Sequence, residues 1–340
     1  MTSFSPIFPE TAVGIGTFPF ASPFSTATSA VSADVLREYL VNGGKCIDTA
    51  PTYDFGRVES LVGSVVSRFP RESVFINTSC GWVRKGDDFV LSGARDDVLR
   101  SLDGSLERLQ VDYIDSYISH RPDPVTPFSD TMQGLLEAKA SGRVRHIGVS
   151  NVTLEQLESY CQNGPVEIVQ NRLSLINRSF SDEFLKLCRG SNVAIAVYQV
   201  IERGLLTDRD DASIIRGAGD LRSRKPEFSA GPRTVIRQWV RDSLRPIAHH
   251  AGTSTPALAI QWAACQPGVA LVQCGASNVA QARTLQDARE LVLDEATLRE
   301  IEDAYAELTD RVQDAGYGSV RHMMGLGEAE PLAGASPSGR

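Results

Sequence analysis

The sequence lacks the patterns of a disulfide-rich, metal-binding or membrane protein. Its six cysteines form no C-x-x-C pair, and no histidine stands near them at metal-ligand spacing. We therefore expect reduced, mostly buried thiols and no bound metal. No apolar run approaches the length that a bilayer requires, and residues 1–8 lack the basic and apolar regions of a secretory signal. These absences predict a cytoplasmic protein with no membrane segment.

Concentrated positive charge is also missing. The 340 residues carry a formal net charge of -8, and the basic residues are scattered along the chain. This distribution argues against a nucleic-acid partner and leaves a small molecule as the expected ligand. A chain of this length and ordinary composition can bury a full core. The sequence leaves the oligomeric state open.

Short apolar runs alternate with amphipathic stretches along the chain. Apolar residues recur at helical spacing at Val98, Leu102, Leu106 and Leu109, which indicates a helix with one buried face. Strands that alternate with helices are typical of a parallel sheet. The expected strands are 13–17, 45–48, 74–78, 114–120, 146–150, 167–170, 194–198 and 270–274. The expected helices are 31–40, 57–69, 98–109, 131–139, 154–161, 234–249 and 293–308.

Eight such units predict an α/β fold, a (β/α)₈ TIM barrel, as a single domain over residues 1–327 with long loops over its C-terminal face. An open doubly wound sheet is the alternative, but the segment from Gly14 to Thr17 lacks the third glycine and the helix of that fold. Residues 207–233 are expected to form a long loop over the barrel mouth, and residues 328–340 a flexible tail.

Polar side chains end several of the expected strands, and a barrel of this kind has its active site at the carboxyl ends of its strands. Asp48 ends one strand, Tyr53 follows it, and His120 ends another. An acid, a phenol and an imidazole form the set expected where a proton is passed to a carbonyl oxygen.

Several segments resemble the signatures of the aldo-keto reductase superfamily. The resemblance covers about residues 10–310. It is carried by Asp48-Thr49-Ala50 with Tyr53, Gly56, Glu59 and Gly63; by Leu106-Glu107-Arg108-Leu109 and Asp112-Tyr113-Ile114-Asp115 with His120; by residues 142–151; and by Val169-Gln170-Asn171 and Gly204-Leu205-Leu206.

The resemblance implies roles for individual residues. Tyr53 would be the general acid, His120 would orient the substrate oxygen, and Asp48 would support Tyr53. Ser150, Asn151 and Gln170 would hold the carboxamide of the nicotinamide, and Tyr198 would lie on its face. The further cofactor residues implied are Thr17, Gly204, Leu206, Gly275, Ala276, Ser277 and Gln281. NADPH is the implied cofactor, with NADH as an alternative.

One catalytic residue departs from the family pattern. Where the family has a lysine after the third strand, this chain has Ser79. Such a lysine lowers the pKa of the tyrosine by its positive charge. Without it we expect Tyr53 to titrate near the ordinary value of about 10. We also expect Asp48 to find another partner, with His120, Arg84 and Lys85 as candidates.

The expected cofactor region departs as well. Tyr198-Gln199-Val200-Ile201 replaces the family's aromatic-Ser-Pro-Leu, and Glu202 brings an anion close to the expected pyrophosphate. Thr284-Leu285 stands where the family grips adenine, which leaves Arg283 or Arg203 to meet a 2′-phosphate. These changes predict weakened or lost NADPH binding.

Three functions agree with these residues. The first is hydride transfer from NAD(P)H to a carbonyl or a conjugated double bond of a small metabolite. The second is a redox-neutral lyase, dehydratase or isomerase that uses Asp48, Tyr53 and His120 as acid and base groups. The third is a non-catalytic regulatory subunit. Aromatic residues in expected loops either wall a substrate pocket or anchor the loops: Phe18, Phe20 and Trp82, with Phe24 and Phe89.

Overall fold

The computed structural model describes residues 7–9, 13–21, 28–86, 88–210, 214–215 and 220–326. Parallel strands close into a barrel in the order β1-β10-β9-β8-β7-β6-β3-β2, which confirms the predicted TIM barrel. Each expected strand is present within a few residues of its predicted bounds. The strands are β1 Val13–Gly16, β2 Cys46–Asp48, β3 Phe75–Cys80, β6 Ile114–Ser119, β7 Val144–Ser150, β8 Ile168–Arg172, β9 Ala194–Tyr198 and β10 Val269–Gly275.

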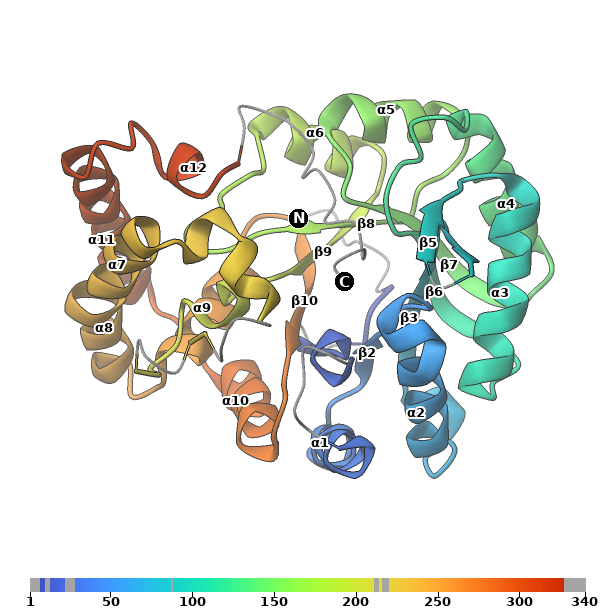
Figure 1. The fold of residues 1–340 in the computed structure, drawn as a ribbon, viewed down its shortest axis with the longest axis horizontal. Coiled ribbons are helices and arrows are strands. Elements are labelled where there is room, and N and C mark those ends of the chain that lie inside the picture. The colour runs from blue at the N-terminus through green and yellow to red at the C-terminus, as the bar shows by residue number, and fades with distance from the viewer. Residues whose placement is uncertain are drawn as a thin grey trace.

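Helices surround the strands on all sides (Figure 1). The helices are α1 Ser29–Val41, α2 Arg57–Val66, α3 Arg95–Leu109, α4 Phe128–Ala140, α5 Leu154–Gln162, α6 Asp182–Gly190, α7 Ala230–Trp239, α8 Arg245–His250, α9 Thr255–Ala264, α10 Val279–Glu290, α11 Glu295–Asp314 and α12 Val320–Met323. A π-helical turn, Val240–Leu244, joins α7 to α8. Many of these helices begin at a side-chain cap, and α5 begins with a full capping box of Thr153 and Gln156.

Several elements differ from the sequence expectation. A hairpin of β4 Trp82–Lys85 and β5 Asp88–Leu91 stands where a loop was predicted. The segment 207–233 is not a continuous loop, because its described part contains 3-10 turns at Leu221–Arg224 and Pro226–Phe228 and the start of α7 at Ala230. Helices α6, α9, α10 and α12 were not predicted. The predicted tail 328–340 lies outside the described residues.

The first signature holds α2 against α3. Glu59 is completely buried, and its carboxylate accepts a hydrogen bond from Thr78 at 2.7 Å and pairs with Arg108 at 2.7 Å. A Cβ on Gly63 would lie 2.4 Å from the carbonyl oxygen of Leu109, so only glycine permits this approach. Gly56, Glu59 and Gly63 therefore position the helices behind the site, while Asp48 and Tyr53 belong to the site itself.

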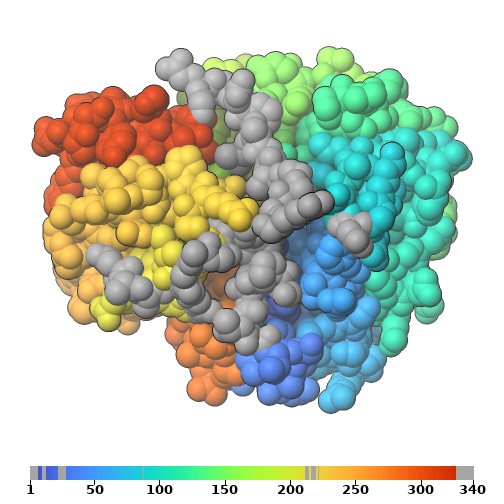
Figure 2. Space-filling model, in the orientation of Figure 1, coloured from blue at the N-terminus to red at the C-terminus, as the bar shows by residue number. Residues whose placement is uncertain are grey.

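Successive segments of the chain follow one another around the centre of the face shown in Figure 2, which is the same face as in Figure 1. The barrel's own strands are short, and many of their buried apolar residues pack with the helices in one large cluster. A second, smaller cluster of strand residues contains Cys46, Phe75, Ile168, Ala194, Ala196 and Leu271, together with Phe8. Within the described part of the chain, no helix combines the length and the apolar character of a membrane span.

Candidate active site

Asp48 ends β2 and is held by side-chain amides. Its Oδ1 accepts a hydrogen bond from Nδ2 of Asn77 at 2.6 Å and from Nε2 of Gln170 at 2.9 Å. Burial raises the pKa of Asp48 to about 6, against the lowering effect of the amides of Gln170, Asn77 and Gln273. The prediction of His120, Arg84 or Lys85 as the partner of Asp48 was wrong. Asn77 fills that role because the register of β2 and β3 pairs it directly with Asp48.

Ser79 lies two residues beyond Asn77, and side chains two apart on a strand share one face. Its hydroxyl lies 3.1 Å from Nδ1 of His120, so the serine contacts the imidazole and forms no hydrogen bond to Asp48. Burial, with a smaller effect from the charge of Arg121, lowers the pKa of His120 to about 4. The imidazole is therefore neutral at physiological pH. Cys80 points away from this face, and burial raises the pKa of its thiol to about 12.

Tyr53 stands beside His120 at the barrel mouth. The two rings meet edge to face with centroids 6.5 Å apart, and Phe18 packs against the phenol at 5.2 Å. The next two residues, Asp54 and Phe55, have left-handed backbone conformations with φ of 49° and 55°. Such conformations cost energy in residues other than glycine, and they fix the turn that presents Tyr53.

The phenol of Tyr53 is a weaker acid than the sequence predicts. Burial raises its pKa well above the ordinary value, and the charge of Asp48 acts in the same direction. The expectation of a pKa near 10 was therefore wrong, because it considered only the absence of a lysine charge and left out the effect of burial on the phenol. Tyr53 keeps its proton throughout the working pH range of most enzymes.

The polar ends of β7, β8 and β9 come together as one hydrogen-bonded group. The Ser150 hydroxyl donates to the Gln170 backbone carbonyl at 2.7 Å, and the Asn151 amide donates to the His120 carbonyl at 2.8 Å. The Tyr198 hydroxyl donates to Oδ1 of Asn151. Gln170 also donates to Gln273. The structure thus links the four residues predicted at the nicotinamide to one another and, through Gln170, to Asp48.

Glu202, which was expected to bring an anion close to a pyrophosphate, is buried and paired with a guanidinium group. Its side chain is 1% exposed and lies 3.1 Å from a guanidinium nitrogen of Arg172. The hydroxyl of Ser174 and the amide of Gln199 donate to the same carboxylate. Arg203, which follows it, pairs with Glu227 at 2.8 Å. Arg283, the other candidate for a 2′-phosphate, pairs with Glu38 at 2.7 Å.

The end of β10 leads into the N-terminus of α10. Both the backbone N–H and the hydroxyl of Ser277 donate to Oε1 of Gln281, at 2.8 and 3.0 Å, and Asn278 caps the helix. Gly275 packs against Pro19, whose Cγ would lie 2.6 Å from an added Cβ. The Thr17 hydroxyl donates to the carbonyl of Asp48 at 2.8 Å. Ser277 and Asn278 therefore lie at a helix N-terminus, which favours an anion.

The remaining predicted site residues differ in their exposure and in the elements that hold them. The side chains of Leu206 and Ala276 are fully buried, and Phe20 is 8% exposed within the core. They therefore anchor the fold, whereas Phe18 is 42% exposed beside Tyr53. Trp82 and Phe89 belong to the β4–β5 hairpin and not to loops. Gly204 ends a 3-10 turn after β9. Phe24 lies outside the described residues.

Two site residues were missed from the sequence. Asn77 was within reach of prediction, because strand alternation puts it on the same face as Ser79. Gln273, which accepts from Gln170, gives no such signal because β10 and β8 are not neighbours in the barrel. A contact across the barrel interior depends on strand tilt and stagger, which sequence spacing does not reveal.

Comparison with known proteins agrees with this geometry. A sequence model of the Aldo/keto reductase family matches residues 12–306. The NADH-specific methylglyoxal reductase of Escherichia coli is 32% identical over 270 residues, which cover 74% of this chain and 81% of that protein. Aldo-keto reductase YhdN of Bacillus subtilis is 30% identical over 278 residues, covering 81% and 84% of the two chains. The glycerol dehydrogenase AKR11B4 of Gluconobacter oxydans shares the fold, with a TM-score of 0.79 at 24% identity over 96% of each chain. With a family match over most of its length, the chain belongs to the aldo/keto reductase family of oxidoreductases.

Proposed function

We propose that this protein reduces an activated carbonyl group, or a double bond conjugated to one, in a small metabolite with NAD(P)H. The observation that carries the proposal is the meeting of Tyr53 and His120 at one rim of the barrel as two uncharged side chains. Two preorganised neutral donors stabilise an oxygen that becomes negative as the neighbouring carbon is reduced.

The side chains present fit a nicotinamide dinucleotide. Ser150, Asn151 and Gln170 offer the hydroxyl and amide groups that would hold its carboxamide, with Tyr198 beside them. The N-terminus of α10 would face a phosphate. When bound, the reduced nicotinamide supplies a hydride to the substrate carbon.

Ser79 takes part by orienting the imidazole. In this proposal its hydroxyl donates to Nδ1 of His120, which leaves Nε2–H to donate to the substrate oxygen. Tyr53 donates to the same oxygen and gives it a proton. Because the pKa of Tyr53 is raised, proton transfer to an ordinary ketone is slow. The site therefore suits an electron-poor acceptor.

The family comparison supports an acceptor of this kind. One relative is named for methylglyoxal, in which one carbonyl group withdraws electrons from the other. Such a substrate needs less help from a strong acid, and the same holds for a conjugated enone. We propose an acceptor of this class for the present chain, with either NADH or NADPH as donor.

The test is nicotinamide consumption with a 1,2-dicarbonyl, an enone and an unactivated aromatic aldehyde. We expect the first two to react faster, and Tyr53→Phe to lose roughly a hundred-fold in rate. Tyr305→Phe is the matched control, because Tyr305 lies on α11 against Arg178, away from the site. Full activity in Tyr53→Phe, or no binding of either nucleotide in a fluorescence titration, would refute the proposal.

A redox-neutral reaction is the second candidate, and the raised pKa of Asp48 favours it. A carboxylate with a pKa of about 6 is a stronger base than an ordinary aspartate and is still ionised at neutral pH. Asp48 would remove a proton next to a carbonyl while Tyr53 supports the oxygen. Deuterium exchange into a ketone without nucleotide, rising as the pH passes about 6, would support this reaction. Exchange that is unchanged in Asp48→Asn would exclude Asp48 as the base.

A further inference from the structure

The turn that presents Tyr53 is strained. Asp54, Phe55 and Gly56 follow one another in the left-handed region, with φ of 49°, 55° and 83°. Glycine adopts this conformation freely, but two other residues in succession keep it only where the surrounding structure holds the backbone. The Asp54 side chain contributes little, because its contact at 3.3 Å is with Arg57, whose side chain is 77% exposed. Phe55 is the remaining residue of the turn whose side chain can hold it.

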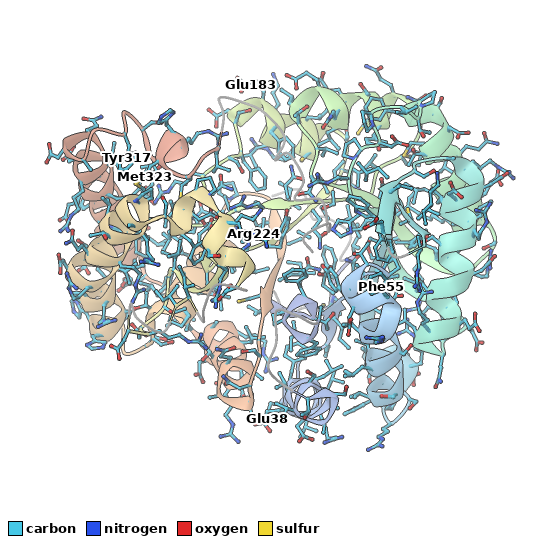
Figure 3. The ribbon with its side chains drawn as sticks, viewed as in Figure 1. Glu38, Phe55, Glu183, Arg224, Tyr317 and Met323 are labelled. Atoms are coloured by element: carbon cyan, nitrogen blue, oxygen red, sulfur yellow. The ribbon has the colours of Figure 1, made fainter. Side chains whose placement is uncertain are left out.

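The ring of Phe55 packs on the β4–β5 hairpin. It stacks on the ring of Phe89 with centroids 5.3 Å apart, and the guanidinium carbon of Arg84 lies 5.0 Å from its centroid. Figure 3 labels Phe55 beside α2, on the side of this face where Figure 1 labels β5. Arg84 and Phe89 pair directly across the hairpin, and Nε of Arg84 donates to the Gly86 carbonyl at 2.7 Å. One face of the hairpin therefore holds the ring through two side chains.

The hairpin continues directly from β3, the strand that bears Ser79. Gly81 alone separates β3 from β4, and its carbonyl accepts a hydrogen bond at 3.1 Å from the first backbone N–H after β5. The carbonyl of the last residue of β3 accepts from the backbone N–H of His120 at 3.0 Å. The hairpin thus belongs to the part of the rim formed by β3 and β6, and Phe55 connects that part to the turn that bears Tyr53.

We propose that the β4–β5 hairpin positions Tyr53 at the reacting centre, and that Phe55 and Phe89 are the positioning residues. The inference rests on the proton-donating role proposed for Tyr53. Tyr53 follows β2 and His120 follows β6, so the placement of one ring against the other depends on how firmly the turn is held. A misplacement of about 1 Å costs roughly a hundred-fold in rate. Because 45% of Phe55 is exposed, loss of the stack should loosen the turn and leave the barrel folded.

Steady-state kinetics with a 1,2-dicarbonyl tests the inference. We expect Phe55→Ala and Phe89→Ala each to lower kcat roughly ten- to hundred-fold and to leave the KM of the nucleotide within about two-fold, because they displace the proton donor and not the nucleotide site. The double variant should be no slower than either single variant, since each removes the same stack. Phe89→Tyr keeps the ring and should restore the rate. Phe180→Ala is the matched control, because it removes a similar stack, with Phe184 of α6 at 5.0 Å, and should leave kcat unchanged.

A measurement without turnover separates this inference from the proposed function. Fluorotyrosine incorporated in place of Tyr53 gives a fluorine NMR signal that reports where the phenol lies and how firmly it is held. Phe55→Ala and Phe89→Ala should shift or broaden that signal, and Phe180→Ala should not.

If the signal follows this pattern in a protein that reduces nothing, the positioning role stands and the reductase proposal fails. In an active protein, an unaltered kcat or an unaltered signal in Phe89→Ala would overturn the positioning role. An equal loss of kcat in Phe180→Ala would overturn it as well, because any lost stack would then have the same effect. Phe89→Leu keeps apolar volume without the ring and gives the same test should the alanine variant fail to fold.

Discussion

Replacing Asp48 with asparagine should stabilise the protein at high pH. The pKa of Asp48 is raised from 3.8 to about 6, chiefly by burial. The folded protein therefore binds this proton more tightly than the unfolded chain, and stability falls as the pH rises from about 4 to about 6. A shift of about two units corresponds to about 3 kcal/mol above pH 6, as an upper limit because the mouth is partly open to solvent. Asparagine keeps an oxygen for the amides of Asn77 and Gln170 and removes the charge.

Thermal unfolding at two pH values tests this reasoning. For a chain of this length, 3 kcal/mol corresponds to a rise in melting temperature of about 4 °C. We expect that rise for Asp48→Asn at pH 8 and almost none at pH 4. Asp115→Asn is the control, because Asp115 is also a carboxylate on a barrel strand but pairs with Arg71 at 2.5 Å and Arg145 at 2.9 Å. Its loss should destabilise the protein at pH 8 by roughly 3 kcal/mol.

A lower melting temperature for Asp48→Asn at pH 8 would refute the account, because it would show that the ionised carboxylate stabilises the barrel. An equal rise at both pH values would also refute it, since the gain would then come from something other than the charge. The rate of hydride transfer in Asp48→Asn is a second measurement. If Asp48 serves the reaction and not stability, the variant should be more stable and less active than the unaltered protein.

Two further changes test the catalytic and the structural parts of the signatures. Ser79→Lys should lower the pKa of Tyr53 and raise the rate with an unactivated aromatic aldehyde by roughly ten-fold, and no gain would show that proton donation is not limiting. Gly63→Ala should destabilise the protein by roughly 1–3 kcal/mol in urea unfolding, because its Cβ would lie 2.4 Å from the Leu109 carbonyl oxygen. Gly190→Ala has open space around its Cβ and serves as the control, so equal losses in both variants would contradict the packing argument.

The barrel was predictable because each of its strands is a short apolar run bounded by polar residues. Of the helices that were not predicted, α9 lacks the usual contrast between two faces. Its Leu258 and Ile260 lie on opposite sides of the helix, and both are buried. A helix that is apolar on most faces shows no 3.6-residue period. The β4–β5 hairpin was missed because charged residues flank its turn at Gly86, which has a positive φ.

The sequence likewise predicted most residues of the candidate site, but not their hydrogen-bond partners or their pKa values. Strand ends and signature spacing placed Asp48, Tyr53, Ser79 and His120 at one rim, and the structure brings them together there. Partners and pKa values did not follow from spacing, because both depend on burial and on contacts across the barrel. The Glu202 carboxylate shows this clearly, since its sequence position suggested repulsion and its structure shows a buried pair with Arg172.

Neutral side chains hold the titratable groups of the site. Amides from Asn77 and Gln170 bind Asp48, and the hydroxyl of Ser79 contacts Nδ1 of His120. Neutral donors hold the geometry but do not offset the burial of Asp48 or of Tyr53, and the pKa values of both rise. A weaker phenolic acid next to a stronger carboxylate base is the physical basis of our proposal that this site acts on electron-poor substrates and not on unactivated ketones.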